Sequence, residues 1–591
     1  MSNIPLEFGG MVNSMLRRIN GFVQYGHHPS VTILTINENF DAESTRQRLV
    51  EQNKLEESVK IRNAWTDLRA MSDDDLRRFV DSCAENTNVT LRDDNSKYSE
   101  SRERLTATAP GTNSDLRKRF YRDDGSLLGV QISTDTADAS ITLCSTTQTP
   151  LAEFKTIEDL YVCWIKNVIE KDKSLLIVDD KMMSEFLCEI VERDFKMVLF
   201  MHGSHLRRPY DGPYGESLAK RTNTMRNIER FDFIATQTRQ QAAAMAAKGI
   251  APEKLRHLPS ELSFSPNLAS AHARRDELSG VIIARLSKLK RVNHAISAIA
   301  EANELGAKTR LTVFGKGPEL ESLRNYSRKL EVEESIKFAG HVADLPSRLE
   351  KSSFSLLTSM SEGLGLAVIE SMAVGCVPIT YDINYGPRDI IDNGVDGFVV
   401  PFGDTNALAA SIVNFLSLTA DEKLKMRVAA IEKAASYLPR ASYARWLTAI
   451  GEVATAKDPL PLQGKPTVKV DDIDISEESN SVCLNIQFAD GEYTDARRLQ
   501  MLLASRKTNT FLQSVGIKGS DDKSFNFPIP YDYFSQSKGQ TFNVFVRFDD
   551  ETWNSKRRLV LPESFEMTDS KDLLWYRTKY GNFSVKIASA N

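Results

Sequence analysis

Short apolar runs recur through most of the chain and alternate with longer stretches in which apolar residues return every third or fourth position. The short runs are typical of strands buried in a parallel sheet, and the longer period is typical of helices that cover such a sheet. The runs lie at residues 31–36, 175–178, 196–201, 231–236, 281–284, 311–314, 336–338, 354–358, 377–380 and 398–401. This alternation predicts an α/β protein.

Two stretches depart from this pattern and predict antiparallel β structure. Residues 86–150 and 465–591 contain short alternating runs separated by Asp, Gly, Ser and Asn turns, such as Asp124-Gly125. The first stretch predicts a β insertion, and the second a β-sandwich accessory domain for acceptor binding or assembly. The aromatic residues of the second stretch either fill its core or stack on sugars: Tyr531, Tyr533, Trp553, Trp575 and Tyr576.

The chain of 591 residues is too long for one core, and the changes of pattern divide it. Residues 1–85 and 151–262 predict a first α/β domain, and residues 274–440 a second one. Residues 441–458 predict a helix that crosses back to the first domain. The first domain lacks an apolar strand before Gly9, so either that strand is lost or the native start lies upstream of Met1.

Charge and cysteine content narrow the class of protein. The net charge of −5 argues against a nucleic-acid binder, which usually has a basic face. The six cysteines are scattered without a CxxC pair, which predicts buried free thiols in a reducing compartment. No run of 18 apolar residues and no basic-then-apolar leader occurs, so we expect a cytoplasmic protein.

The candidate chemistry centres on a polar loop that leads into a helix at residues 359–373. The loop contains Glu362, two glycines and Leu364, and the helix begins near Leu366 and carries Glu370. Gly363 and Gly365 allow a ligand to approach the backbone, and a helix N-terminus is a natural seat for phosphate. Glu370 is either a ligand contact or an ordinary solvated helix residue.

Other candidate residues follow neighbouring strands, where ligands of open parallel sheets lie. Arg285 and Lys290 flank a basic turn after the strand at 281–284, and could neutralise a departing pyrophosphate. His202 and His205 follow the strand at 196–201; His202 is the stronger candidate, although a lone histidine is often structural. Asp179 and Asp180 follow another strand and are interpreted as turn and helix-capping acids rather than metal ligands.

Glu362 and Glu370 with EGLG between them resemble the E-x7-E motif of retaining nucleotide-sugar glycosyltransferases of family 4 type with the GT-B fold. The continuation GCVPITYDINYGPRDII is similar to the branch that glycosylates wall teichoic acid, a poly(glycerol or ribitol phosphate), or serine-rich surface proteins. The likeness covers roughly residues 9–454 and is strongest at 281–402. It implies two Rossmann-like domains that face a cleft.

The resemblance also implies roles for particular residues. Arg285 and Lys290 would clamp the donor diphosphate, Glu362 would hold the transferring sugar, and Glu370 would bind the ribose. His202 would lie near sugar and acceptor. The remaining donor-binding positions would be the Gly-Gly loop and the loops around the uracil and phosphates: Gly9, Gly10, Gly340, His341, Val342, Gly363, Leu364, Gly365 and Leu366.

The function implied is transfer of glucose or N-acetylglucosamine from a UDP-sugar, with retention, to a hydroxyl of an anionic cell-wall polymer or its lipid-linked precursor. The alternatives are an O-glycosyltransferase for Ser/Thr-rich surface proteins and a non-catalytic partner of a sister transferase. The UDP-sugar is a substrate, and neither cofactor nor metal is expected. Relatives of this kind imply a trimer through the β insertion and peripheral contact with the inner face of the plasma membrane.

Overall fold

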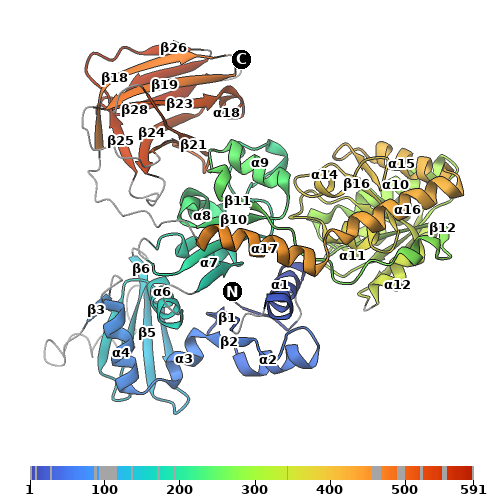
Figure 1. Ribbon diagram of the computed structural model, residues 1–591, viewed down its shortest axis with the longest axis horizontal. Helices are drawn as coiled ribbons and strands as arrows, with labels where there is room; N and C mark the ends of the chain where they lie inside the picture. Colours follow the sequence, from blue (N-terminus) through green and yellow to red (C-terminus); the bar gives the residue numbers. More distant parts are fainter. Residues whose placement is uncertain are drawn as a thin grey trace. The chain divides into compact units, whose positions relative to one another are not determined.

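The computed structural model describes most of the chain, which divides into two compact units, Met1–Val198 and Leu199–Asn591 (Figure 1). The described residues are 3–6, 9–26, 30–84, 89–91, 116–134, 137–169, 174–190, 193–342, 344–454, 467–478, 480–488, 499–519, 523–548, 556–570 and 572–588. Among these residues, no helix combines the length and apolarity needed to cross a membrane.

The first unit begins with a long helix whose apolar stripe packs on a two-stranded parallel sheet. The elements here are α1 (Gly10–Gly26), β1 (Thr32–Thr35), α2 (Ala42–Glu51), β2 (Lys60–Asn63), α3 (Ala64–Ala70) and α4 (Asp73–Ala84). β1 pairs with β2, and the helix buries Val12, Met15 and Leu16 against Ile33 and Ile61. The described residues 3–6 form no strand.

An antiparallel sheet follows in the first unit, with strand order β3-β7-β6-β5-β4. Its strands are β3 (Val89–Leu91), β4 (Leu116–Tyr121), β5 (Leu127–Thr134), β6 (Ala137–Cys144) and β7 (Pro150–Phe154). Then come α6 (Ile157–Val168), β8 (Leu175–Val178), α7 (Lys181–Leu187) and β9 (Lys196–Met201), which crosses into the second unit. Asp180 caps α7 by accepting from the backbone N–H of Met182 at 2.7 Å, as predicted.

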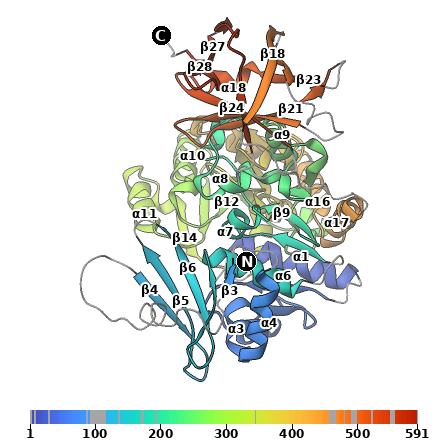
Figure 2. The ribbon, with the colours of Figure 1, turned by 90° about the vertical axis from the view of Figure 1, so that its left-hand side faces the viewer.

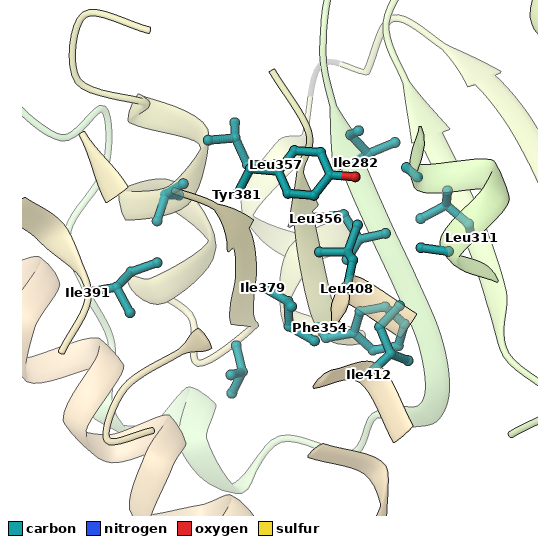
Figure 3. Packing of buried hydrophobic residues seen from close by; sticks show 14 of the residues in the cluster. Ile282, Leu311, Phe354, Leu356, Leu357, Ile379, Tyr381, Ile391, Leu408 and Ile412 are labelled. Atoms are coloured by element: carbon teal, nitrogen blue, oxygen red, sulfur yellow. The ribbon is translucent and has the colours of Figure 1, made fainter. Parts of the chain in front are cut away.

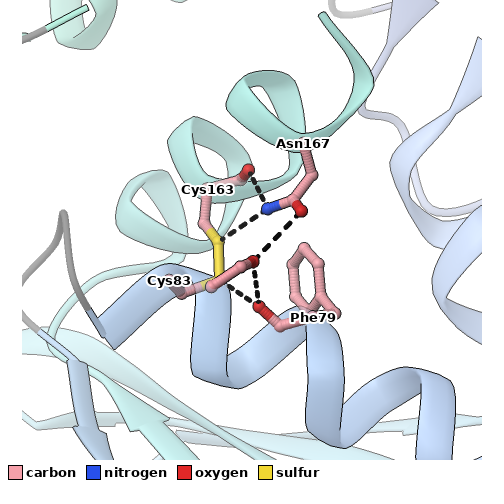
Figure 4. Close-up of a disulfide and its surroundings, with 5 residues drawn as sticks. Phe79, Cys83, Cys163 and Asn167 are labelled. Atoms are coloured by element: carbon pink, nitrogen blue, oxygen red, sulfur yellow. Dashed lines mark hydrogen bonds between the residues drawn. A yellow bond between two sulfur atoms is a disulfide. The ribbon is translucent and has the colours of Figure 1, made fainter.

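A disulfide between Cys83 and Cys163 joins α4 to α6 (Figure 4). The prediction of free thiols is therefore wrong for these two residues, although Cys144, Cys188, Cys376 and Cys483 are free and buried. The partners lie 80 residues apart and share no spacing motif, so the sequence offered no signal for the bond. Disulfides are rare in reducing compartments. This bond therefore weakens the inference, drawn from the scattered cysteines, that the protein resides in such a compartment.

The second unit contains a six-stranded parallel sheet of order β14-β13-β12-β15-β16-β17, the order of a doubly wound nucleotide-binding domain. Its strands are β12 (Asp276–Ile283), β13 (Arg310–Phe314), β14 (Ile336–Gly340), β15 (Ser352–Leu357), β16 (Val377–Tyr381) and β17 (Phe398–Val400). Its helices are α10 (Val292–Glu304), α11 (Leu320–Lys329), α12 (Leu345–Glu350), α13 (Leu366–Met372), α14 (Pro387–Ile390), α15 (Thr405–Ser417) and α16 (Ala420–Ala435).

Apolar side chains from both faces of this sheet pack against its helices (Figure 3). Phe354 and Ile379 on neighbouring strands meet Leu408 and Ile412 of α15, and all four are fully buried. Burying each such side chain stabilises the fold by about 1.5–3 kcal/mol. The carboxyl edge of the sheet, where the candidate residues lie, therefore rests on a closely packed base.

Before this sheet, the second unit holds the end of β9, then α8 (Thr222–Arg226), β10 (Phe233–Thr236), α9 (Arg239–Ala247) and β11 (Leu255–His257). The strand order here is β11-β10-β9. Helix α17 (Pro439–Ala454) follows the six-stranded sheet in the chain but packs on this earlier region. Its Trp446 is 1% exposed, and the ring centroid lies 5.9 Å from that of Phe200 and 6.1 Å from that of Phe233.

The last part of the second unit is rich in strands that share one core. The elements are β18 (Thr467–Glu477), β19 (Ser481–Phe488), β20 (Leu499–Ser505), β21 (Phe511–Val515), β22 (Ile517–Lys518), β23 (Ser524–Pro530), α18 (Tyr531–Ser535), β24 (Thr541–Phe548), β25 (Arg557–Val560), β26 (Thr568–Ser570), β27 (Leu573–Arg577) and β28 (Phe583–Ile587). β18 pairs with β25 through residues 467–469 and with β19 from Val470 onward, so it belongs to two groups of strands. Tyr533 and Trp575 lie in the core, whereas Trp553 lies outside the described residues.

These strands contact helix α9 directly (Figure 2). The backbone N–H of Gln513 in β21 donates to the carbonyl of Lys248, which follows the helix, at 3.1 Å. A Cβ on Gly249 would lie 1.5 Å from the Gln513 carbonyl oxygen, and its φ of +89° also favours glycine. The chain thus turns at Gly249 in a conformation that lets the two backbones meet.

Candidate functional site

Two loops at the carboxyl edge of the six-stranded sheet form the candidate site. The basic turn, residues 285–291, connects β12 to α10, and the cradle loop, residues 358–365, connects β15 to α13. β12 and β15 are neighbours at the point where the strand order reverses, which is where ligands of such sheets bind. The Thr358 hydroxyl donates to the carbonyl of Lys290 at 3.0 Å, so the two loops are joined.

The cradle loop ends in a helix start that no side chain of a described residue caps. Gly365 has a φ of +90°, precedes the first helical residue Leu366 and makes no side-chain capping bond. Leu364, the residue before it, is buried at 2% exposure, and its carbonyl oxygen would lie 1.9 Å from a Cβ on Gly386. The loop is therefore fixed from behind, while the first N–H groups of the helix can turn to a ligand.

The basic turn and the cradle loop bring a lysine and a glutamate together. Lys290 Nζ lies 2.5 Å from Glu362 Oε1, and the two side chains are 24% and 16% exposed. The Ser359 hydroxyl donates to the same carboxylate oxygen at 2.6 Å. This partly buried pair places one positive and one negative group within reach of a ligand at the strand reversal.

Arg285 lies on the same turn but is exposed, and its side chain makes no hydrogen bond or ion pair with any described residue. A guanidinium carries five N–H donors in a planar fork that matches phosphate oxygens. An arginine whose donors the described residues leave unused is well suited to bind an anion. The turn below it is fixed, because a Cβ on Gly317 would lie 2.2 Å from the carbonyl oxygen of Leu286.

His202 lies directly against the cradle loop. A Cβ on Gly363 would fall 2.0 Å from the His202 carbonyl oxygen, so only glycine allows this approach. The same carbonyl accepts a hydrogen bond from the Gln237 side chain at 3.0 Å. Residues 199–262 and the six-stranded domain therefore meet at the residue next to Glu362.

His205 has a different environment from His202. It is fully buried, neither ring nitrogen has a partner in the described residues, and its ring stacks on Tyr385 at 6.1 Å. Burial, aided by the charges of Lys248 and Arg221, holds the pKa of His205 well below its usual range. The ring is therefore neutral near pH 7 and packs as an aromatic group.

Other predicted donor residues of this domain lie in α13 and on the loop after β14. Glu370, one turn into α13, accepts a hydrogen bond from the Ser263 hydroxyl at 2.8 Å. β14 ends at Gly340, whose φ is +72°, followed by exposed His341 and half-buried Val342. In the strand order, β14 and the loop after it lie on the other side of β12 from β15, which carries the cradle loop with Glu362.

Gly9 and Gly10 belong to the first unit, where they lie at the beginning of α1. Both are exposed, and a Cβ at either position would meet no atom within 4 Å. No close packing among the described residues therefore requires glycine at these positions. Their role in donor binding stays a prediction.

A pocket of about 130 Å³, which the sequence did not predict, lies on the other side of the cradle loop. It lies at the carboxyl ends of β15, β16 and β17 and is lined by Tyr210, Gln240, Met360, Asp382, Ile383, Asn384, Arg388 and Phe402. The rule that ligands gather at this edge could have indicated residues 382–388, but it was not applied to them. The contribution of Tyr210 and Gln240 depends on the fold and had no signal in the sequence.

Comparison with known proteins bears on this geometry. Residues 270–436 match the family described as "Glycosyl transferases group 1". This segment is a group 1 glycosyltransferase domain. It contains the basic turn, the cradle loop and most of the pocket.

Curated and solved relatives extend the likeness beyond the glycosyltransferase domain. A poly(glycerol-phosphate) alpha-glucosyltransferase of Bacillus subtilis is 22% identical over 327 residues, which is 53% of this chain and 48% of the relative. A crystal structure of S. aureus TarM with Fondaparinux, alpha-GlcNAc-glycerol and UDP has a TM-score of 0.56 at 15% identity, over 77% of this chain and 99% of that one. The pneumococcal O-GlcNAc transferase GtfA with UDP and GlcNAc has a TM-score of 0.54 at 16% identity, over 77% and 98%.

These likenesses confirm the predicted resemblance to teichoic-acid-type glycosyltransferases and the GT-B fold. The chain spans about half the length of the Bacillus relative, and the identity to the solved structures is low. The sugar, the acceptor and the roles of individual residues are therefore matters for proposal.

Proposed function

We propose that the protein is a retaining, metal-independent glycosyltransferase that moves glucose or N-acetylglucosamine from a UDP-sugar to a hydroxyl of a polyol-phosphate polymer. The observation that carries the proposal is the Lys290–Glu362 pair, held at the strand reversal beside the exposed side chain of Arg285. Cations placed where a pyrophosphate leaves stabilise the charge that develops in the transition state. A glutamate next to them can hold and orient sugar hydroxyls.

In the proposed reaction the acceptor oxygen bonds to the anomeric carbon as the bond from that carbon to the UDP oxygen breaks. The acceptor approaches the face from which UDP departs, so the configuration is retained. The proton of the acceptor hydroxyl passes to the departing phosphate oxygen, and no side chain needs to act as base. Arg285 and Lys290 would bind that phosphate, and Glu370 would bind the ribose hydroxyls.

His202 would form one wall of the sugar pocket, because it lies against Gly363. His205 is not suited to proton transfer, because it is buried and its pKa is depressed. We therefore leave His205 out of the proposed mechanism.

A second candidate function is O-glycosylation of Ser/Thr-rich surface proteins, favoured by the similar fold of GtfA. A third is a non-catalytic partner of a sister transferase. The intact Arg285, Lys290, Glu362 and Glu370 favour catalysis over that third function. The trimer, the cytoplasmic location and the contact with the membrane face stay predictions.

Incubation of the full chain with labelled UDP-glucose or UDP-N-acetylglucosamine and poly(glycerol phosphate) tests the proposal. We expect UDP release that depends on the polymer, with an α-linked sugar on a polymer hydroxyl by NMR. A Ser/Thr-rich polypeptide serves as the competing acceptor. Absence of UDP binding, measured by calorimetry, together with absence of turnover on either acceptor would favour the non-catalytic function.

A further inference from the structure

The pocket beyond the cradle loop lies on the opposite side of Glu362 from the loops predicted to bind the nucleotide. Apart from the cradle loop itself, the predicted nucleotide loops of this domain follow β12 and β14, whereas the pocket residues of this domain follow β15, β16 and β17. Met360, two residues before Glu362, forms part of the pocket wall. A molecule in the pocket would therefore approach the transferring sugar from the side that the donor leaves open.

One wall of the pocket is aromatic. Tyr210 is 56% exposed, and its ring stacks on Phe402 with centroids 6.3 Å apart and an interplanar angle of 18°. Phe402 is supported from behind, since the Arg291 guanidinium lies 4.7 Å from its centroid and the Tyr381 ring 6.0 Å away. Flat aromatic faces of this kind pack on the carbon skeleton of a sugar or a polyol.

The other wall is polar and carries a cation. Arg388 pairs with Asp382, and its side chain remains 63% exposed. The Gln240 side chain donates to the Asn384 amide oxygen at 2.7 Å, which holds both amides at the rim. A single carboxylate does not use all five donors of a guanidinium, so Arg388 can also bind phosphate oxygens.

The size of the pocket fits one small hydroxylated unit. Its volume of about 130 Å³ corresponds to about four water molecules in the liquid. That is room for a three-carbon polyol with its phosphate at the exposed rim, and it leaves the rest of a polymer in solvent.

We propose that this pocket is the acceptor subsite and holds one polyol-phosphate unit, with its carbon skeleton along Tyr210 and Phe402 and its phosphate on Arg388. The inference rests on the proposed function and adds to it the place where the acceptor binds. A serine or threonine side chain would use the aromatic wall but gain nothing from the arginine, so the cation favours the phosphate polymer.

The test compares Arg388→Gln and Tyr210→Ala with the unchanged full chain. We expect Arg388→Gln to raise the KM for poly(glycerol phosphate) by about tenfold to a hundredfold, the range of a lost charge-assisted contact. Tyr210→Ala should also raise this KM, because the aromatic contact with the carbon skeleton is lost. The Kd for UDP and the slow hydrolysis of the UDP-sugar without acceptor should not change. Free glycerol 3-phosphate should inhibit the unchanged chain competitively against the polymer and inhibit Arg388→Gln more weakly.

Arg310→Gln is the matched control. Arg310 forms an exposed ion pair with Asp276 at 2.6 Å in the same domain, but at the amino end of β13, away from the pocket. It should leave the KM for the polymer unchanged. Tyr210 is exposed and makes no hydrogen bond to a described residue through its hydroxyl, so Tyr210→Ala keeps the test valid even if Arg388→Gln folds poorly.

The outcomes separate this inference from the proposed function. If UDP binds and turnover proceeds but neither variant changes the KM for the polymer, the acceptor subsite lies elsewhere and the proposed function stands. If Tyr210→Ala raises the KM for a Ser/Thr-rich polypeptide while the polymer is not used, the inference is overturned in favour of a protein acceptor. If UDP does not bind, both fail.

Discussion

Lys290 and Glu362 form the pair on which the proposed chemistry depends. In the absence of a ligand, each residue balances the charge of the other. With a sugar diphosphate bound, the lysine suits the phosphate and the carboxylate suits the sugar hydroxyls. Because the pair is partly buried, its attraction is screened less than that of a surface pair. A departing phosphate would compete with Glu362 for the lysine, which leaves the carboxylate available to sugar hydroxyls.

Lys290→Ala should lower kcat by about a hundredfold or more, the scale of losing one charge-stabilising donor. Lys288→Ala is the control, because Lys288 lies on the same turn but is exposed and makes no ion pair with a described residue. Initial rates of UDP release measure both variants. Near-normal turnover of Lys290→Ala would remove this lysine from the diphosphate clamp.

Gly363→Ala should lower both stability and activity. The added Cβ would lie 2.0 Å from a backbone oxygen, that of His202, so residues 199–262 and the cradle loop must move apart. Overpacking of this kind costs about 1–3 kcal/mol. Thermal unfolding and UDP release measure the two effects.

Gly203→Ala provides the comparison, since a Cβ there meets no atom within 4 Å. It should behave like the unchanged chain. If both substitutions lowered stability and UDP release equally, the close approach of Gly363 to His202 would not be the cause of the loss in Gly363→Ala.

At the scale of elements, Lys248 connects helix α9 to the strands that follow α17. It is 1% exposed, its ammonium group donates to the Gly215 carbonyl at 2.8 Å, and it lies 5.5 Å from the Phe511 ring centroid. Burial lowers the pKa of Lys248 from 10.5 to about 7, and the charge of Glu216 opposes that shift. Folding therefore favours the neutral amine.

The sign of the pH effect follows from that shift. Between pH 7 and 10 the unfolded chain binds a proton at Lys248 that the folded chain does not, so the free energy of unfolding rises with pH. The slope approaches about 1.4 kcal/mol per pH unit. Denaturant unfolding at pH 7.0, 7.75 and 8.5 should show this rise. Lys248→Met should make the rise shallower without removing it, because burial also lowers the pKa of Lys556 to about 8. Lys220→Met, at an exposed position, should keep the full rise.

Elements with a strong apolar pattern were predictable from the sequence. The strands expected at 175–178 and 196–201 are β8 and β9 with the same bounds. Those of the six-stranded sheet agree to within two residues at each end, except that β12 begins five residues before the predicted run. β2 was missed because its four residues include only one apolar side chain, Ile61, within a stretch of helical period. β20 and β21 were missed although most of their residues are buried, because apolar and polar residues do not alternate along LQMLLAS or FLQSV.

Residues of the candidate site could be predicted only where they belong to a recognisable sequence motif. The structure pairs Lys290 with Glu362 and places His202 against Gly363, positions that strand ends and glycines mark in the sequence, while the roles of these residues stay predictions. The disulfide and the pocket wall of Tyr210 and Gln240 depend on contacts between distant segments, which local pattern does not encode.

At the scale of the whole molecule, the net charge of −5 opposes association with a polyanion. Arg285 and Arg388 are exposed near the candidate site. They can attract polymer phosphates at short range, whereas the net charge repels the polymer at longer range. Salt at 0.1 M screens charge interactions beyond about 10 Å, so it already removes the long-range repulsion. Higher salt concentrations then weaken the local attraction between the arginines and the polymer phosphates.

We therefore expect the KM for poly(glycerol phosphate) to rise severalfold between about 0.1 M and 0.5 M NaCl, because the local contacts dominate binding. The KM for a Ser/Thr-rich polypeptide should change little over the same range. Initial rates at several salt concentrations measure both. A polymer KM that falls steadily with salt would mean that no local cationic contact holds the acceptor.

The bond between Cys83 and Cys163 encloses the five-stranded antiparallel sheet in a covalent ring. A protease site introduced at the exposed Asp124-Gly125 turn between β4 and β5 would be cut inside that ring. The nicked chain should then migrate as one species in denaturing electrophoresis and separate into two fragments only after a reductant is added. Nicked protein taken directly from its own cell, with thiols blocked at lysis, would thus report the redox state of the compartment in which the chain resides.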